Sequence, residues 1–235
     1  MKISRLYPLT LLALSLSTAL SAQENAQYGN EKKQVPDESN IEKLTVSGQR
    51  LQGYRYNEAD GASPLSISIK DLPQSVTVIG LEQIRDYSLN DVNTLLNNVT
   101  GVNVEEVETD RTYYTARGFD ISNFQVDGLG LPVINGNTHG DLDTAIYDRV
   151  EVIRGANGLM TGVGNPSATV NLVRKKTTED NFVSVRGQIG SWNNKRLDVD
   201  ASGKLSDTVR GRVVLAKQDK ESYLDRYELD KTIAY

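Results

Sequence analysis

The sequence contains no cysteine and only one histidine, and these shortages narrow the chemistry that the chain can perform. Without cysteine, a disulfide framework and a thiolate metal site are both excluded. The single histidine, His139, has no second ligand at metal-binding spacing, so neither a metal nor a haem cofactor is expected. Lysine and arginine number 26 against 31 aspartates and glutamates, and the resulting net charge of −5 argues against a nucleic-acid partner.

Long apolar runs are also absent beyond the N-terminus, since no stretch reaches the ~20 residues that a membrane-spanning helix needs. A membrane protein with this sequence would therefore have to cross the bilayer with β-strands. The N-terminus itself predicts an export signal over residues 1–21. Lys2 and Arg5 precede the apolar run Leu9 to Leu20, and cleavage is expected after Ser21 or Ala22. An N-terminal anchor helix is the alternative, but the run is too short to span.

Residues 22–70 are rich in polar residues and predict a flexible segment. Within it, Ile41 to Gly48 alternates apolar, charged and β-branched residues, which is typical of an extended strand. The pattern leaves two interpretations open: an edge strand of the following domain, or an exposed peptide that adds to a partner's sheet. Leu51 to Ser68 is again rich in glycine and polar residues and predicts a second flexible stretch.

The next segment predicts short, mixed elements. Val76 to Ile79 reads as a strand, and apolar residues at helical spacing predict helices over Leu81 to Asp86 and Asp91 to Asn98. Gly101 is expected at the C-terminal cap of the second helix. Val102 to Val104 alternates as a strand.

A glycine-rich loop between two β-branched runs dominates the centre of the chain. Arg149 to Arg154 and Ala168 to Arg174 predict strands, and the spacer between them holds four glycines. The spacer lacks the Gly-Lys-Ser/Thr ending of a phosphate-binding loop, and Gly162 and Gly164 are not followed by the third glycine of a dinucleotide site. A nucleotide is therefore not the expected ligand.

After Thr178 the pattern changes to alternating strands of about ten residues with turns between them. Strands are predicted over Phe182 to Gly190, Lys195 to Ser202 and Thr208 to Ala216. In each of them apolar residues occupy one face and polar or charged residues the other, and the charged faces taken together carry both signs. The alternation fits a soluble sandwich as well as the wall of a membrane barrel with a polar interior.

Several motifs together resemble one family, the TonB-dependent outer-membrane receptors. They are the sequence RVEVIRG from Arg149, GLMTGVGNPSA from Gly158, ARGF from Ala116 and VDG from Val126. The form of the second motif looks most like receptors for ferric coprogen and rhodotorulic acid. Ala156 stands where the family usually has proline, and Ser167-Ala168 stands where it has two glycines.

The resemblance implies a fold and a location. The fold would be an α+β plug domain, a mixed sheet with short helices, over residues 71–177, followed by the first strands of a transmembrane antiparallel β-barrel over residues 178–235. Such a barrel has 22 strands, so the 57 residues after Thr178 would leave it incomplete and the chain would be an N-terminal fragment. The implied location is the outer membrane, in contact with its lipid.

The resemblance also implies three sets of site residues. A TonB box at residues 42–48 would bind the periplasmic protein TonB as an added strand through Glu42, Lys43, Leu44, Thr45, Val46 and Ser47. Arg117 and Arg154 would lock the plug to glutamates of the barrel. The apex of the plug would contact the ferric siderophore through Asn135, Asn137, Thr138 and His139. The loop from Leu129 to Thr144 has no Lys or Arg, which favours a hydroxamate chelate over an anionic catecholate.

A sensor-transducer and an extracytoplasmic enzyme are the two alternatives to siderophore uptake. A sensor-transducer of the same family would need a folded signalling domain before the TonB box, and residues 23–40 are too few to form one. An extracytoplasmic enzyme would need a catalytic constellation, and His139 has no identifiable partner for one. The predicted function is therefore siderophore uptake, without catalysis and without a resident cofactor.

Overall fold

The computed structural model describes residues 54–59, 68–131, 137–155, 157–158 and 166–235. The chain divides into two units, Met1–Gly48 and Gln49–Tyr235, and all of the described residues belong to the second. The predicted TonB box and the apex residue Asn135 lie outside the described residues.

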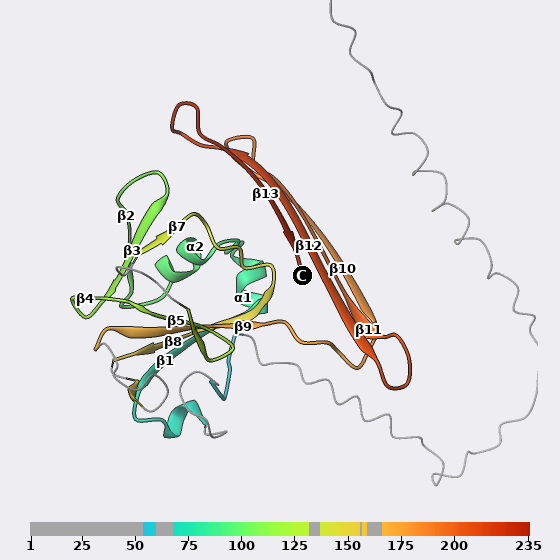
Figure 1. Ribbon diagram of the computed structural model, residues 1–235, viewed down its shortest axis with the longest axis horizontal. Coiled ribbons are helices and arrows are strands. Elements are labelled where there is room, and N and C mark those ends of the chain that lie inside the picture. The colour runs from blue at the N-terminus through green and yellow to red at the C-terminus, as the bar shows by residue number, and fades with distance from the viewer. Residues whose placement is uncertain (1–53, 60–67, 132–136, 156, 159–165) are drawn as a thin grey trace, which may run out of the picture. The chain divides into compact units, whose positions relative to one another are not determined.

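A mixed five-stranded sheet forms the base of the structure (Figure 1). Its strands follow the order β1-β8-β9-β5-β6, and only the pair β5 and β9 is parallel. The β-branched runs that predicted two strands form its centre, where nearly every residue is buried. The strand bounds are β1 Ser75–Gly80, β5 Asn123–Val126, β6 Leu129–Leu131, β8 Tyr147–Arg154 and β9 Ala168–Arg174.

Two short helices, α1 (Leu81–Asp86) and α2 (Val92–Asn97), supply apolar side chains to a core that they share with this sheet. Leu95, Leu96 and Phe124 are almost fully buried in that core. Asp91 caps α2 by accepting a hydrogen bond from the backbone of Thr94 at 2.7 Å. Both helices agree with the sequence prediction, and among the described residues no helix is long and apolar enough to cross a bilayer.

Gly101 does not cap α2, contrary to the sequence prediction. The helix ends at Asn97 with Asn98 as its C-cap in a helical conformation, and Gly101 lies three residues beyond Asn98 with φ of 79°. The positive φ is the reason why glycine suits this position, since other residues would be strained there. The glycine therefore serves the turn that leads into the strand β2.

A small sheet beside the helices carries the segment that sequence analysis treated as a polar loop. Its strands follow the order β2-β3-β4, with β7 paired to β3. The predicted loop from Leu129 to Thr144 thus contains two strands, β6 and β7, because backbone pairing can order a polar segment that has no apolar pattern. The bounds are β2 Asn103–Glu106, β3 Arg111–Ala116, β4 Phe119–Asp120 and β7 Asn137–His139.

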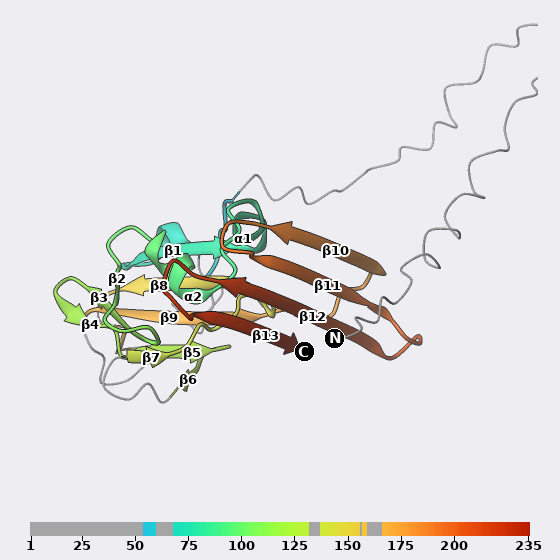
Figure 2. The same ribbon diagram turned by 90° about the horizontal axis from the view of Figure 1, so that it is seen from above.

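A third, antiparallel sheet, here called the C-terminal sheet, runs in the order β10-β11-β12-β13 (Figure 2). Its outer face carries exposed apolar side chains such as Val183, Ile189 and Val213. Its other face turns charged side chains toward the helices and the mixed sheet. The alternation follows the two-residue period that the sequence predicted. The bounds are β10 Phe182–Ile189, β11 Lys195–Lys204, β12 Arg210–Glu221 and β13 Glu228–Ala234.

Part of the segment predicted to be flexible is folded. Glu58 forms a β-bridge with Ser68, just before the one-turn helix η2 (Ile69–Asp71), and Ala59 is buried against Ile153. Tyr56 packs over β1 so closely that a Cβ at Gly80 would overlap its ring. The prediction of flexibility fails here because a few apolar and aromatic side chains become buried against the sheet. Composition alone does not reveal the surface that buries them. The domain boundaries drawn from the sequence stay predictions.

Candidate functional site

Arg154 ends β8 and directs its guanidinium onto oxygen atoms of neighbouring segments. Nη2 donates to Oγ of Ser75 at 2.7 Å, and Nη1 donates to Oγ1 of Thr77 at 2.9 Å and to the carbonyl of Thr100 at 2.8 Å. These partners are neutral and belong to β1 and to the turn after α2. Arg154 therefore ties two parts of the domain together.

Arg117 lies beside Arg154 in the turn between β3 and β4. Gly155, with φ of 99°, leaves room for its guanidinium, since a Cβ there would lie 2.7 Å from Nη1. Burial lowers the pKa of Arg154, and the positive charge of Arg117 lowers it further. No carboxylate among the described residues pairs with either arginine. Two adjacent positive groups are thus held together at one edge of the domain.

The predicted apex residues separate into different environments. On β7, Thr138 turns inward, where its hydroxyl lies 2.7 Å from that of Tyr114. The Tyr114 hydroxyl also contacts the amide oxygen of Asn93 on α2. Burial raises the pKa of Tyr114 to about 12, so the phenol stays neutral and can donate. His139 is exposed, with Nδ1 4.0 Å from a carboxylate oxygen of Asp110.

A cleft of about 600 Å³ opens beside β7, and its walls come from both halves of the fold. One wall is the β2–β3 turn with Gly140 and Asp141, and the other is formed by the turns that connect β10 to β11 and β12 to β13. We call this space the apex cleft. The sequence alone did not predict this cleft.

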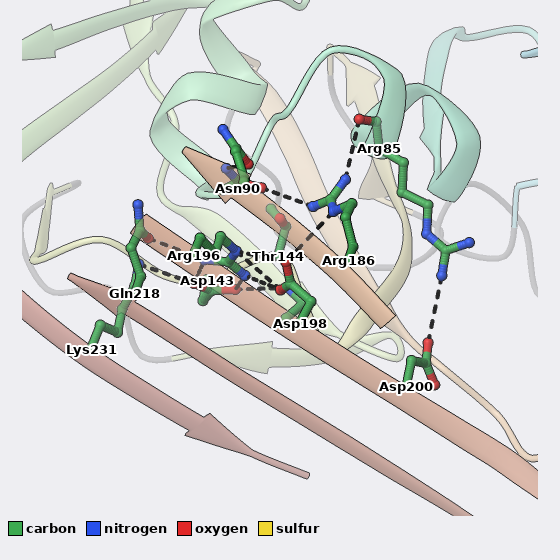
Figure 3. Close-up of polar contacts among 12 residues, drawn as sticks. Arg85, Asn90, Asp143, Thr144, Arg186, Arg196, Asp198, Asp200, Gln218 and Lys231 are labelled. Carbon is green, nitrogen blue, oxygen red and sulfur yellow. Dashed lines mark hydrogen bonds and ion pairs between the residues drawn. The ribbon is translucent and has the colours of Figure 1, made fainter. Parts of the chain in front are cut away.

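A deeply buried ion pair lies where β11 meets the segment before β8 (Figure 3). Arg196 donates from Nη1 to Oδ2 of Asp143 at 2.7 Å and from Nη2 to Oδ1 at 2.8 Å. The two side chains are 1% and 2% exposed. Asp198, Gln218 and Lys231 complete the surroundings of this pair. Burial would raise the pKa of Asp143, but the hydrogen bonds and charge of Arg196 outweigh it and hold the pKa below its usual value.

A second group of charges lies further along β11. Asp200 accepts from Nζ of Lys175 at 2.9 Å and from Nη2 of Arg212 at 2.8 Å, and Nη2 of Arg85 on α1 lies 3.8 Å away. Burial lowers the pKa of Lys175, and the bond to Asp200 offsets part of this effect. A third link joins the same helix to β10, where Arg186 donates to the carbonyl of Arg85 at 3.2 Å.

These contacts turn the polar face of the C-terminal sheet into an interface with the rest of the fold. Arg85 lies on α1, Lys175 follows β9 and Asp143 precedes β8, and the opposite charges, Asp200 and Arg196, both come from β11. Sequence analysis predicted which face of each strand is charged, but it did not identify the partners. Among the described residues there is no group of three or more His, Asp or Glu side chains that could hold a metal ion.

The segment that contains the two helices and most of the mixed sheet matches a known family of domains. Residues 68–169 match the family model described as the TonB-dependent Receptor Plug Domain, and this part of the chain is such a plug domain. The curated relatives that match are named as siderophore and metal-chelate receptors, which are transport proteins rather than enzymes.

Particular relatives can be named. The chain is 43% identical over 181 residues to the ferripyoverdine receptor of Pseudomonas aeruginosa, an alignment that covers 74% of this chain and 22% of that receptor. The crystal structure of the ferripyoverdine receptor of the outer membrane of the same species matches with a TM-score of 0.73 at 40% identity, over 77% of this chain and 25% of that one. The alcaligin outer-membrane receptor of Bordetella pertussis matches with a TM-score of 0.67 at 38% identity, over 74% and 31%.

The chain thus spans less than a third of each of these relatives. They are receptors for ferripyoverdine and alcaligin, whereas the sequence motifs suggested receptors for ferric coprogen and rhodotorulic acid. The class predicted from the motifs is confirmed, and the finer resemblance is not supported by these relatives. The motif residues all lie within the segment that matches the plug-domain family model.

Proposed function

We propose that the chain supplies the plug and the first wall strands of an outer-membrane receptor that takes up a ferric siderophore. The observation that carries this proposal is the two-sided character of the C-terminal sheet. One face pairs with the plug through buried charges such as Arg196 and Asp143, and the other exposes apolar side chains. A barrel wall with lipid outside and a plug inside needs this alternation.

Coupling to energy is assigned to the TonB box. Residues Glu42, Lys43, Leu44, Thr45, Val46 and Ser47 would bind TonB in the periplasm by pairing as an added strand. This peptide precedes the plug, so a pull on it would be transmitted to Ser68 and β1. The plug would then move or partly unfold and open a path for the chelate. The export signal over residues 1–21 belongs to the same proposal.

The pair Arg117 and Arg154 is assigned the role of locking the plug to glutamates of the barrel. Its support is the arrangement of two adjacent guanidinium groups without a carboxylate among the described residues. Placing like charges together costs free energy, and a carboxylate that approached both would recover it. Bidentate hydrogen bonds make arginine the suitable side chain for such a lock.

The ligand is assigned as a ferric siderophore of hydroxamate type. Its Fe(III) is already coordinated by the chelate, so the receptor needs polar donors and aromatic surface and no metal ligand of its own. Asn135, Asn137, Thr138 and His139 are the proposed contacts at the apex. Of the described members, His139 is exposed on β7, Asn137 is half-buried, and Thr138 is half-buried with its hydroxyl turned inward. A receptor for another iron chelate, and a sensor-transducer, remain the alternatives.

The experiment that tests this function measures growth and iron uptake. Cells that lack every other siderophore receptor would produce the full-length protein and receive ferric coprogen, ferric rhodotorulic acid, ferripyoverdine or ferric enterobactin under iron limitation. Uptake of at least one hydroxamate-containing chelate, lost in a strain without TonB, is the expected result. Uptake of ferric enterobactin alone would refute the hydroxamate assignment, and no uptake of any chelate would refute the siderophore assignment.

A further inference from the structure

The apex cleft has the size and the composition of a ligand site. Its volume of about 600 Å³ falls within the range of about 300 to 1,000 Å³ that is usual for small-molecule pockets. The plug and the C-terminal sheet both line it, so a molecule bound there would contact the moving and the fixed part of a receptor at once. Such a position is where a transported ligand can influence the plug.

Aromatic side chains form the outer wall of the cleft. Trp192 and Tyr223 come from two different turns, and their ring centroids are 6.5 Å apart in an edge-to-face arrangement. They remain 57% and 74% exposed although both are large and apolar. Tyr227 lines the same wall. Exposed aromatic rings that converge on a cleft offer contact area for a ligand, and their faces attract positive charge.

The charge of the lining is strongly one-sided. Five carboxylates face the cleft against a single lysine, Lys220. The carboxylates are Glu106, Glu108, Asp110, Asp141 and Glu221. Two of these carboxylates already have a cationic partner in the protein, since Arg111 pairs with Glu108 and Lys220 lies 3.6 Å from Asp141. The remaining excess of negative charge would repel an anionic chelate and attract a cationic one.

Glu106 is the carboxylate best placed to meet a ligand. It ends β2 at the rim of the cleft, and none of the described cations pairs with it. Asp141 lies deeper and is held in place by Asn93, whose amide donates to it at 3.0 Å. The aromatic wall thus stands opposite the plug carboxylates across the cleft.

We propose that the apex cleft selects ferric siderophores that carry a positively charged group, which lies between the rings of Trp192 and Tyr223 and the carboxylates of Glu106 and Asp141. The inference rests on the proposed function and adds to it the charge of the siderophore. The recognised feature is a protonated amine or guanidinium attached to the iron chelate, whatever the charge of the chelate itself. Removing that one charge should weaken binding about two- to fivefold, the range expected for a partly exposed ion pair.

The test uses a matched pair of probes and the full-length protein. Ferrioxamine B is a hydroxamate chelate with a protonated terminal amine, and its N-acetyl derivative has the same chelate without that charge. Binding of each probe, loaded with radioactive iron, to cells that display the full-length protein and lack TonB gives the two affinities without transport. We expect tighter binding of ferrioxamine B, with a difference that shrinks as salt is added.

Two variants identify the carboxylate. Glu106→Gln should reduce the preference for the cationic probe, whereas Glu105→Gln should leave it unchanged, since the adjacent residue on β2 points to the opposite face. Equal affinity of the two probes for the unmodified chain, or equal effects of the two variants, would overturn the proposal. Absence of binding of either probe would overturn it as well. In each case iron uptake by the full-length protein still decides the proposed function independently.

Discussion

Arg196 of β11 and Asp143 of the plug form a bidentate ion pair that is almost completely shielded from solvent. Lys231 of β13 adds a second cation 3.1 Å from the same carboxylate, and the backbone N–H of Ala145 donates to it at 2.8 Å. Neither partner could be hydrated in this position if the other were removed. The pair therefore makes the contact between plug and C-terminal sheet sensitive to single substitutions.

Replacing Arg196 with methionine should destabilise the contact between plug and sheet by about 3 to 5 kcal/mol, because Asp143 would be left buried beside Lys231 alone. Chemical denaturation of the full-length protein, followed by protection of plug amides from hydrogen exchange, measures the loss. Asp230→Asn is the matched control. It breaks the exposed pair with Lys217 and should cost less than about 1 kcal/mol. Equal losses in the two variants would contradict the assigned importance of the buried pair.

Acid should weaken the same contact, and the direction follows from the pKa of Asp143. Its pKa in the folded state lies below the value of about 3.9 for an unfolded chain. The carboxylate therefore contributes stability that is fully present above about pH 4 and is lost as the pH falls through the lower, folded-state pKa. Denaturation midpoints measured down to about pH 2 should fall less steeply in Asp143→Asn than in the unmodified protein. Parallel curves would show that this carboxylate is not responsible.

The two arginines at the other edge of the plug should behave differently from each other. Arg154→Ala removes hydrogen bonds to Ser75, Thr77 and Thr100, so it should loosen the plug itself by about 1.5 to 3 kcal/mol, even without a lock to the barrel. Arg117→Ala should matter only if a barrel carboxylate pairs with it. Hydrogen exchange of β1 and β8 in the full-length receptor separates the two cases. Unchanged plug protection in Arg117→Ala would remove this residue from the proposed lock.

Proline in the TonB box should uncouple binding from transport. Leu44→Pro or Val46→Pro removes a backbone donor from the predicted strand and disturbs its pairing with TonB. Uptake of the ferric siderophore should be abolished, while binding to the receptor at the cell surface should keep its affinity. Ala26→Pro, in the polar segment before the box, is the control and should transport normally. Wild-type uptake in both box variants would refute the assignment of residues 42–48.

Local patterns predicted most of the regular elements. The helices from Leu81 and Asp91 carry the apolar spacing of elements that face a core on one side, so the sequence predicts them directly. The strand from Ala168 is buried on both faces, and its β-branched run predicted it. The charged faces of β10 and β11 were predictable for the same reason. The segment 54–59 was not, because its order depends on a surface offered by β1 and β8, far away in sequence.

The candidate site was less predictable than the fold. The sequence singled out Arg117 and Arg154 only through a family resemblance, and their proximity to each other became clear from the structure. Asp143 looked like one acid in a polar loop, since its partner lies on another sheet. The aromatic wall of the apex cleft combines Trp192 and Tyr223 from separate turns. Contacts of this kind join residues that are far apart in the sequence, so the local spacing of apolar and polar residues does not reveal them.

The ion pair between Asp143 and Arg196 also sets an order of events during assembly. Asp143 precedes Arg196 in the chain, so its main counter-charge is in place only once β11 has paired with β10 and β12. Until then, burying Asp143 is opposed by its own desolvation, so this corner of the plug should tighten only after the sheet beside it has formed.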